Sequence, residues 1–271
     1  MNFLTGARYV FTKDYDLEGF MEYASALGLD FVQLSYEAPL TWVGAIDKAR
    51  RKRIRDLSLN LGLPVCVHSV TNAVNVAWTN TGIRQESLRQ LAEAIEFTYD
   101  VGADLITVHP GWKDMYGYRY PEDAYNLAVE GHRQVADSAA GYGIRIAIEN
   151  MPPGWTSFCT GPEDTKAMLE AIDRPNAGLT LDMGHANILS GSAISDFITA
   201  INHKIFLIHI HDNEGKRDQH QAIGEGTIDF HQAIGLLKKA GLNVPLCIES
   251  KSLDDLKEGK ARLDELLADI G

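Results

Sequence analysis

Short apolar runs rich in β-branched residues alternate with longer amphipathic stretches along the whole chain. Apolar runs of this length are typical of buried strands, and apolar residues spaced three or four apart are typical of helices. After a weak strand near Phe3–Gly6, the sequence predicts clear strands at Phe31–Tyr36, Val65–Ser69, Leu105–Pro110, Ile144–Asn150, Gly178–Met183, Ile205–Asp212 and Leu246–Ser250. It predicts helices at Leu17–Leu27, Val43–Leu61, Ile83–Val101, Pro121–Tyr142, Pro162–Ile172, Ala193–Ile201, Phe230–Ala240 and Leu253–Leu267.

Each predicted strand is followed by a predicted helix, so the chain contains eight β/α units. An open doubly wound sheet usually stops at five or six strands, whereas eight parallel strands close into a barrel. Composition does not change along the chain, and there is no linker. The sequence therefore predicts an α/β protein that is a single (β/α)8 TIM barrel domain over residues 1–271, with its active site at the C-terminal face.

The charge balance restricts the partners of the chain. Lys and Arg number 25 against 37 Asp and Glu, a formal net charge of −12. An acidic surface repels phosphate backbones, so nucleic acid and anionic membranes are disfavoured. No apolar run approaches the roughly 20 residues that span a bilayer, and the first residues lack a basic and apolar leader. We expect a cytoplasmic protein whose three separated cysteines, Cys66, Cys159 and Cys247, are buried reduced thiols.

Residues that carry chemistry stand at the ends of six successive predicted strands. The C-terminal strand ends of a parallel barrel meet at one rim, where active sites form. These ends read Val67-His68-Ser69, Val108-His109-Pro110-Gly111, Ile148-Glu149-Asn150, Leu181-Asp182-Met183-Gly184-His185, Ile208-His209-Ile210-His211-Asp212-Asn213 and Ile248-Glu249-Ser250. A single histidine at such a position is more often a hydrogen-bonded structural group. Six together favour a functional rim.

Three of these strand ends are acidic: Glu149, Asp182 and Glu249. A carboxylate beside apolar strands loses solvation worth several kcal/mol, and three at one barrel mouth also repel each other. Divalent cations remove both costs. After the seventh strand, Asp218 and His220 are two apart in an extended loop and can share a metal. The Gly224-Glu225-Gly226 segment that closes this loop fits a tight turn better than a phosphate-binding loop, because it lacks the P-loop context.

The ordered set of motifs resembles the xylose-isomerase-like TIM barrel superfamily, which contains sugar phosphate isomerases and epimerases as well as type IV apurinic endonucleases. The motifs, which extend over nearly the whole chain, are Val-His-Pro-Gly, Ile-Glu-Asn, Leu-Asp-Met-Gly-His, His-Ile-His-Asp-Asn, Asp-Gln-His-Gln-Ala-Ile-Gly-Glu-Gly and Ile-Glu-Ser. In the isomerase branch, the resemblance implies one metal held by Glu149, Asp182, His209 and Glu249. In the endonuclease branch, it implies two further zinc ions, held by His68 and His109 with the shared Glu149, and by His185, Asp218 and His220.

The resemblance implies a divalent-metal-dependent sugar or sugar phosphate isomerase or epimerase that acts by proton abstraction through an ene-diolate. Glu149 and Glu249 would be the catalytic acid and base on opposite faces of a small carbohydrate substrate. His185 and Arg217 would orient that substrate, and Trp112 would wall its pocket together with the loop at Trp155. Between one and three ions of Mn²⁺, Zn²⁺, Co²⁺ or Fe²⁺ suit this donor set.

Two other functions stay open. In a type IV apurinic/apyrimidinic endonuclease, clustered zinc ions would generate hydroxide for phosphodiester cleavage. Such an enzyme must grip DNA and open its stack, yet the loop at residues 69–75 holds no aromatic residue and no Lys or Arg. A lyase or dehydratase acting on a keto-sugar or an inositol is the third alternative, since fold alone does not define function. Sugar identity, phosphorylation of the substrate and oligomeric state are left undetermined.

Overall fold

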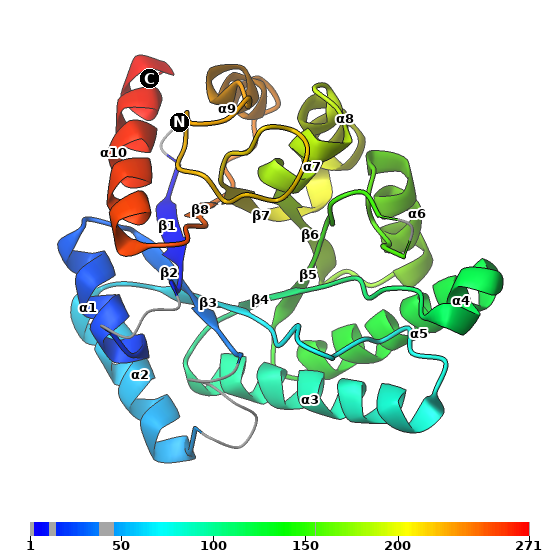
Figure 1. The fold of residues 1–271 in the computed structure, drawn as a ribbon. Helices are drawn as coiled ribbons and strands as arrows, with labels where there is room; N and C mark the ends of the chain where they lie inside the picture. Colours follow the sequence, from blue (N-terminus) through cyan, green and yellow to red (C-terminus); the bar gives the residue numbers. More distant parts are fainter. Residues whose placement is uncertain (1–2, 11–14, 38–45, 155, 271) are drawn as a thin grey trace.

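The computed structural model describes residues 3–10, 15–37, 46–154 and 156–270. Eight parallel strands pair in sequence order and close into a barrel, because β8 pairs with β1 (Figure 1). The strands are β1 Thr5–Arg8, β2 Phe31–Ser35, β3 Val65–His68, β4 Leu105–Val108, β5 Arg145–Glu149, β6 Ala177–Asp182, β7 Ile205–Ile210 and β8 Leu246–Ile248. The predicted (β/α)8 TIM barrel is confirmed.

Helices form the outer ring around the strands (Figure 1). They are α1 Leu17–Ala26, α2 Lys48–Leu61, α3 Thr81–Asp100, α4 Met115–Arg119, α5 Pro121–Ala140, α6 Pro162–Ile172, α7 Met183–Leu189, α8 Ala193–Ile201, the 3₁₀ turn η1 Asn202–Lys204, α9 Phe230–Lys239 and α10 Leu253–Ile270. All eight predicted helices are present, whereas α4 and α7 were not predicted. Residues 43–45 of the predicted helix Val43–Leu61 lie outside the described residues, and α2 begins after Asp47, whose side chain accepts a hydrogen bond from the Arg50 N–H.

The barrel interior is built in layers, because alternate strand residues point inward. A buried apolar layer fills the N-terminal part with Phe31, Cys66, Leu105, Ala147, Leu207 and Cys247. Two residues further along the strands, Gln33 donates to Thr107 (3.0 Å), which hydrogen bonds to Thr180 (2.9 Å). On the other strands, the residues two positions after Cys66, Ala147, Leu207 and Cys247 of the apolar layer are His68, Glu149, His209 and Glu249. The period of two therefore places the chemical groups at the C-terminal mouth.

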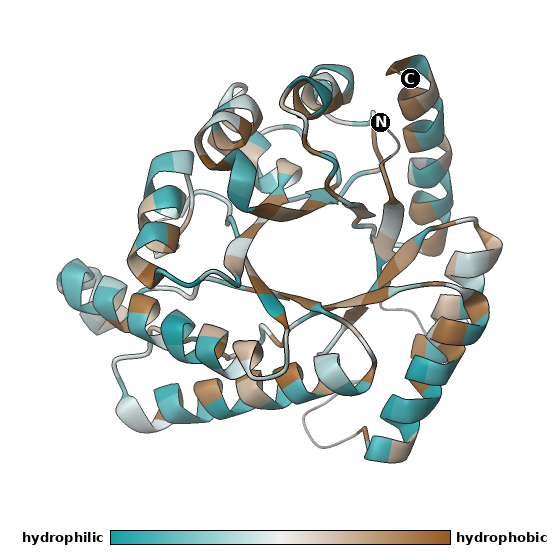
Figure 2. Ribbon diagram, turned by 180° about the vertical axis from the view of Figure 1, so that it is seen from behind, coloured by the Kyte–Doolittle hydropathy of each residue, from teal (hydrophilic) through white to brown (hydrophobic). Residues whose placement is uncertain are grey.

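The larger apolar core lies between the strands and the helices. Figure 2 shows the apolar colouring concentrated on the strands and on the helix sides that face them, with hydrophilic residues on the outer helix surfaces. All three cysteines are buried and free, which confirms the expectation of reduced thiols. None of the described helices combines the length and the apolar character needed to cross a bilayer.

Candidate metal centre

Four ligand-type side chains converge at the mouth of the barrel from four successive strands. Glu149, Asp182, His209 and Glu249 each offer one donor atom, and these atoms all lie within 4.8 Å of one another. Each of the four residues is at most 4% exposed. The backbone fixes them there: Glu149 ends β5, Asp182 ends β6 and is paired in register with His209 on β7, and Glu249 follows β8. The four predicted ligands of the first metal are therefore brought together.

His209 lies between the acids. Its Nδ1 is 3.1 Å from Glu149 Oε1, 3.2 Å from Glu249 Oε1 and 3.8 Å from Asp182 Oδ2. One ring nitrogen carries at most one proton, so it cannot donate to all three carboxylates at once. A cation that all four groups share would satisfy them together, and this donor set of one imidazole and three carboxylates suits a divalent transition metal.

Protons offset the buried negative charge in the absence of a metal. Burial opposes the charged form of His209, but Glu249 and Glu149 raise the pKa of this imidazole to about 10. Burial alone would raise the pKa of Glu249, yet the charges of His209 and Arg8 lower it to about 2. The pKa of Glu149 likewise stays well below its ordinary value despite burial, mainly because of His209. In the metal-free chain the three carboxylates are therefore balanced by Arg8 and by protonated histidines, and a divalent cation could take the place of those protons.

Arg8 is a rim residue that the sequence analysis missed. Its Nη1 donates to Glu249 Oε1 at 2.9 Å, and its side chain is 23% exposed. The weak first strand was predicted at Phe3–Gly6, whereas β1 spans Thr5–Arg8. In that register Gly6 and Arg8 follow the same period of two as the other strands, and this pattern is the signal that could have located Arg8.

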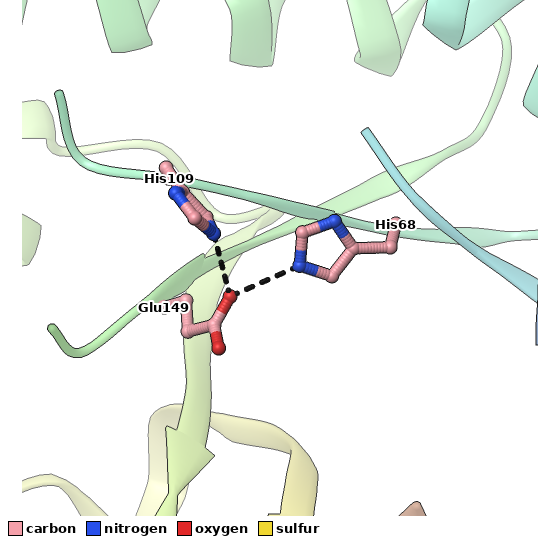
Figure 3. A group of neighbouring side chains, drawn as sticks. All are labelled: His68, His109 and Glu149. Atoms are coloured by element: carbon pink, nitrogen blue, oxygen red, sulfur yellow. Dashed lines mark hydrogen bonds and ion pairs between the residues drawn. The ribbon is translucent and has the colours of Figure 1, made fainter. Parts of the chain in front are cut away.

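A second group consists of His68, His109 and Glu149, as predicted for the second metal (Figure 3). Both Nε2 atoms approach Glu149 Oε2, at 3.1 Å from His68 and 3.2 Å from His109. The Nδ1 of His68 is 3.0 Å from the Ser69 carbonyl oxygen, which can only accept, so Nδ1 carries the proton. Burial and the charge of Arg8 lower the pKa of His68 to about 4, so the ring is neutral at pH 7. Its Nε2 lone pair therefore faces a carboxylate oxygen, an arrangement that a shared cation would satisfy.

The third predicted group comprises His185, Asp218 and His220. The Oδ2 of Asp218 is 3.4 Å from His185 Nε2 and 3.0 Å from His220 Nε2, so the predicted pairs exist. His185 Nδ1 donates to the Asn150 carbonyl oxygen at 2.8 Å. Despite burial, the charges of Asp182 and hydrogen bonding to Asp218 raise the pKa of His185 to about 10.

His211 joins this third group, although the sequence analysis gave it no role. Its Nε2 is 3.0 and 3.1 Å from the two Asp182 oxygens, and its ring stacks on His220 with centroids 4.0 Å apart. His211 Nδ1 is buried and has no hydrogen-bond partner among the described residues. His211, Asp218 and His220 form one ligand-type group, and Asp182, His185 and His211 form another. His211 continues the alternation of β7 after His209, which was the available signal.

A buried carboxylate holds the long loop after β7, which lies over the barrel end in Figure 1. Asp212 Oδ2 accepts hydrogen bonds from the N–H groups of Gly224 (3.1 Å) and Gly226 (2.9 Å), and its Oδ1 accepts from Ile228 (3.2 Å). These N–H groups bind an internal acid, so the segment is a turn and not a phosphate-binding loop, as predicted.

The predicted substrate-binding residues lie around this mouth. Trp112 is half-buried after β4, and its indole packs edge-on against Trp78 with ring centroids 5.7 Å apart. Arg217 is exposed in the β7–α9 loop, one residue before Asp218. Trp155 lies outside the described residues. The substrate-binding roles of His185, Arg217 and Trp112 stay predictions.

The fold and the site define a class, a (β/α)8 barrel with clustered metal-ligand side chains at its C-terminal mouth. A family model described as "Xylose isomerase-like TIM barrel" matches residues 21–266. The chain belongs to this family.

Relatives carry different names. An uncharacterized protein of Methanocaldococcus jannaschii, MJ1614, is 31% identical over 212 residues, which cover 78% of this chain and 81% of that protein. A probable endonuclease 4 of Mycobacterium leprae is 27% identical, covering 82% of this chain and 85% of that protein. A crystal structure of a D-tagatose 3-epimerase-like protein superposes with a TM-score of 0.86 at 25% identity, covering 98% of this chain and 97% of that one. One of these similar proteins has an endonuclease name and another an epimerase-like name, so family membership does not choose between the two functions.

Proposed function

We propose that the chain is a divalent-metal-dependent sugar isomerase or epimerase that moves a proton on the carbon beside a carbonyl group. The convergence of Glu149, Asp182, His209 and Glu249 within 4.8 Å carries this proposal. The similarity to a D-tagatose 3-epimerase-like structure supports a sugar as the substrate class. A bound Mn²⁺, Zn²⁺, Co²⁺ or Fe²⁺ ion would polarise the sugar's carbonyl and hydroxyl oxygens.

Glu149 and Glu249 are the proposed acid and base. The pKa of Glu249 is lowered to about 2, because burial is outweighed by the charges of His209 and Arg8, so this carboxylate is ionised at neutral pH and can accept a proton. Its Oε1 is held by Arg8 at 2.9 Å, which restricts the rotation of the carboxylate. The Oε2 of Glu149 lies 3.1 Å from His68 Nε2 and 3.2 Å from His109 Nε2, and its Oε1 can accept a hydrogen bond from His209 Nδ1 at 3.1 Å. One of these carboxylates would take the proton from one face of the carbon, and the other, once it has taken up a proton from solvent, would give that proton to the opposite face.

Hydrogen exchange in D₂O tests the proposal. The metal-loaded protein is incubated with a panel of ketoses, and loss of the C–H signal beside the carbonyl is followed by NMR. We expect exchange with at least one ketose, and its abolition in Glu249→Gln but not in the exposed loop variant Glu225→Gln. Absence of exchange with every ketose would refute the proposal. Release of water from the substrate would indicate the lyase or dehydratase alternative.

A type IV apurinic endonuclease is the second candidate, favoured by the additional His68, His109 and Glu149 group and by the name of the Mycobacterium leprae relative. The net charge of −12 opposes it. Several basic residues of α2 also pair with acids: Lys48 and Arg51 with Asp100, and Arg50 with Glu18. We expect no cleavage of a duplex with one abasic site at low enzyme concentration. Strand scission that disappears in Asp182→Ala would establish this candidate instead.

A further inference from the structure

A small cavity opens beside Glu249 at the barrel mouth. Its volume is about 190 Å³, and it is lined by Arg8, Tyr9, His220, Glu249, Ser250 and Lys251. Pockets for whole drug-sized ligands span about 300–1,000 Å³, so this cavity suits one end of a substrate. Glu249 lines the cavity and is also one of the four proposed metal ligands. A group bound in the cavity would therefore lie next to the site where the substrate's C–H bond is broken.

Two cationic side chains from distant parts of the sequence meet at this cavity. Arg8 uses Nη1 for Glu249 and Nε for the Ser35 hydroxyl at 3.4 Å, while its Nη2 has no hydrogen-bond partner among the described residues. Lys251 is exposed after β8 and forms no ion pair within the described part of the chain. Glu249, the carboxylate that lines the cavity, is already paired with Arg8. In a chain of net charge −12, this pocket keeps unused positive donors.

From this juxtaposition we infer that the Arg8–Lys251 cavity binds the phosphate of a phosphorylated sugar substrate. The inference rests on the proposed function and narrows its substrate class. A phosphate monoester has three terminal oxygens, and the cavity wall offers three donor groups: the Arg8 guanidinium, the Lys251 ammonium and the Ser250 hydroxyl. Charge-assisted hydrogen bonds from Arg and Lys are the usual means of holding phosphate. A neutral sugar end would leave Lys251 without an anionic partner among the described residues, and would give the Nη2 of Arg8 no charged acceptor beyond Glu249.

Binding of inorganic phosphate tests the subsite without requiring turnover. Isothermal titration calorimetry compares the metal-loaded protein with Lys251→Met and with the matched control Lys257→Met, which removes another exposed lysine from helix α10. We expect Lys251→Met to weaken phosphate binding by about tenfold, since one charge-assisted contact is lost. Lys257→Met should bind phosphate as the unaltered protein does. Equal affinities in all three proteins would overturn the inference, because any bound phosphate would then lie elsewhere.

Hydrogen exchange with paired substrates separates the two proposals. For each ketose and its phosphate ester, Lys251→Met should raise KM for the ester about tenfold while kcat changes less than about twofold, because a contact common to substrate and transition state is removed. Exchange of free ketoses as efficient as that of their esters, or a preference for a sugar carboxylate, would overturn the subsite and leave the enzymatic proposal intact. Phosphate binding that depends on Lys251 without exchange of any ketose would refute the enzymatic proposal and leave the subsite intact.

Discussion

Replacement of Gly184 by alanine would disturb the site through one added methyl group. Gly184 is the second residue of α7, and a Cβ there would lie closer than 3.0 Å to three ring atoms of His211. The His211 ring cannot easily retreat, because it is fully buried, contacts both oxygens of Asp182 and stacks on His220. The backbone at Gly184 lies outside the left-handed region, so the clash is with the imidazole and does not arise from backbone strain.

The change in the free energy of unfolding that Gly184→Ala should cause is the sum of three contributions. Overpacking a close-packed site costs about 1–3 kcal/mol, and loss of the hydrogen bond between His211 and the Asp182 carboxylate costs about 1.5–3 kcal/mol. Alanine regains about 1 kcal/mol over glycine in a helix. We therefore expect Gly184→Ala to lower the free energy of unfolding by about 1.5–5 kcal/mol. Because His211 orients Asp182, affinity for a metal should also fall by about 10–100-fold.

Urea unfolding followed by tryptophan fluorescence measures the first effect, and competition with a chromophoric chelator measures the second. Gly235→Ala is the matched control, since Gly235 lies within α9 and a Cβ there meets nothing within 4 Å. This variant should be slightly more stable than the unaltered protein. In a His211→Ala background, the cost of Gly184→Ala should nearly vanish, because the clashing ring is gone. The reasoning is refuted if Gly184→Ala unfolds at the same urea concentration as Gly235→Ala.

Three further predictions concern the acids and the metal. Glu149→Gln and Glu249→Gln should each abolish hydrogen exchange while the far-ultraviolet circular dichroism stays unchanged, and a wild-type rate in either variant would reject its role. Protein purified without chelators should carry at least one divalent transition metal ion per chain by elemental analysis, and its absence would count against the metal site. The pKa of His209 is raised to about 10 by Glu249 and Glu149 despite burial, so a metal must displace its proton. Metal affinity should therefore rise about tenfold per pH unit from pH 6 to 8 in calorimetric titrations, whereas a flat profile would contradict this competition.

The strands could be located from the sequence because each buried run is short and apolar, but several of their ends could not. The prediction Ile205–Asp212 overshoots β7, which ends at Ile210. Asp212 leaves the barrel to form a bridge with Gln221 and to bind the N–H groups of the following loop. Gln221 lies nine residues after Asp212, so the composition around Asp212 could not indicate this bridge.

Helix α7 was hidden for a related reason. Asp182 is the last residue of β6 and also the N-cap of α7, where its Oδ1 accepts from the His185 N–H at 2.7 Å. The predicted strand Gly178–Met183 therefore runs directly into a helix without an intervening loop. This abrupt junction brings His185 back toward the strand end, within 3.6 Å of Asp182 Oδ2. The direct junction of β6 and α7 at Asp182 thus made the helix hard to predict, and it also brings His185 of the third group close to Asp182 of the first.

Most of the candidate site could be predicted, since most of its ligand-type residues lie at or just after the ends of strands that meet at one rim. Arg8 and His211 were the exceptions. Arg8 belongs to the strand with the weakest apolar pattern, whose register was predicted two residues too early. His211 was visible two positions after His209, yet its role depends on its contacts with Asp182 and His220, which lie on other segments.

The rigidity of the barrel prevents the acids at its mouth from relieving their repulsion by moving apart. Parallel ladders hold β5, β6, β7 and β8 side by side, with Glu149 in register with Thr180, and Asp182 with His209. Neighbouring strands lie about 4.8 Å apart, and shifting one acid would break backbone hydrogen bonds on both of its sides. Protons on His209 and His185 offset the acids in the metal-free chain, and a divalent ion bound at these residues would have to displace them. In the proposed metal site, the repulsion that the backbone holds in place would therefore add to the affinity for a divalent ion.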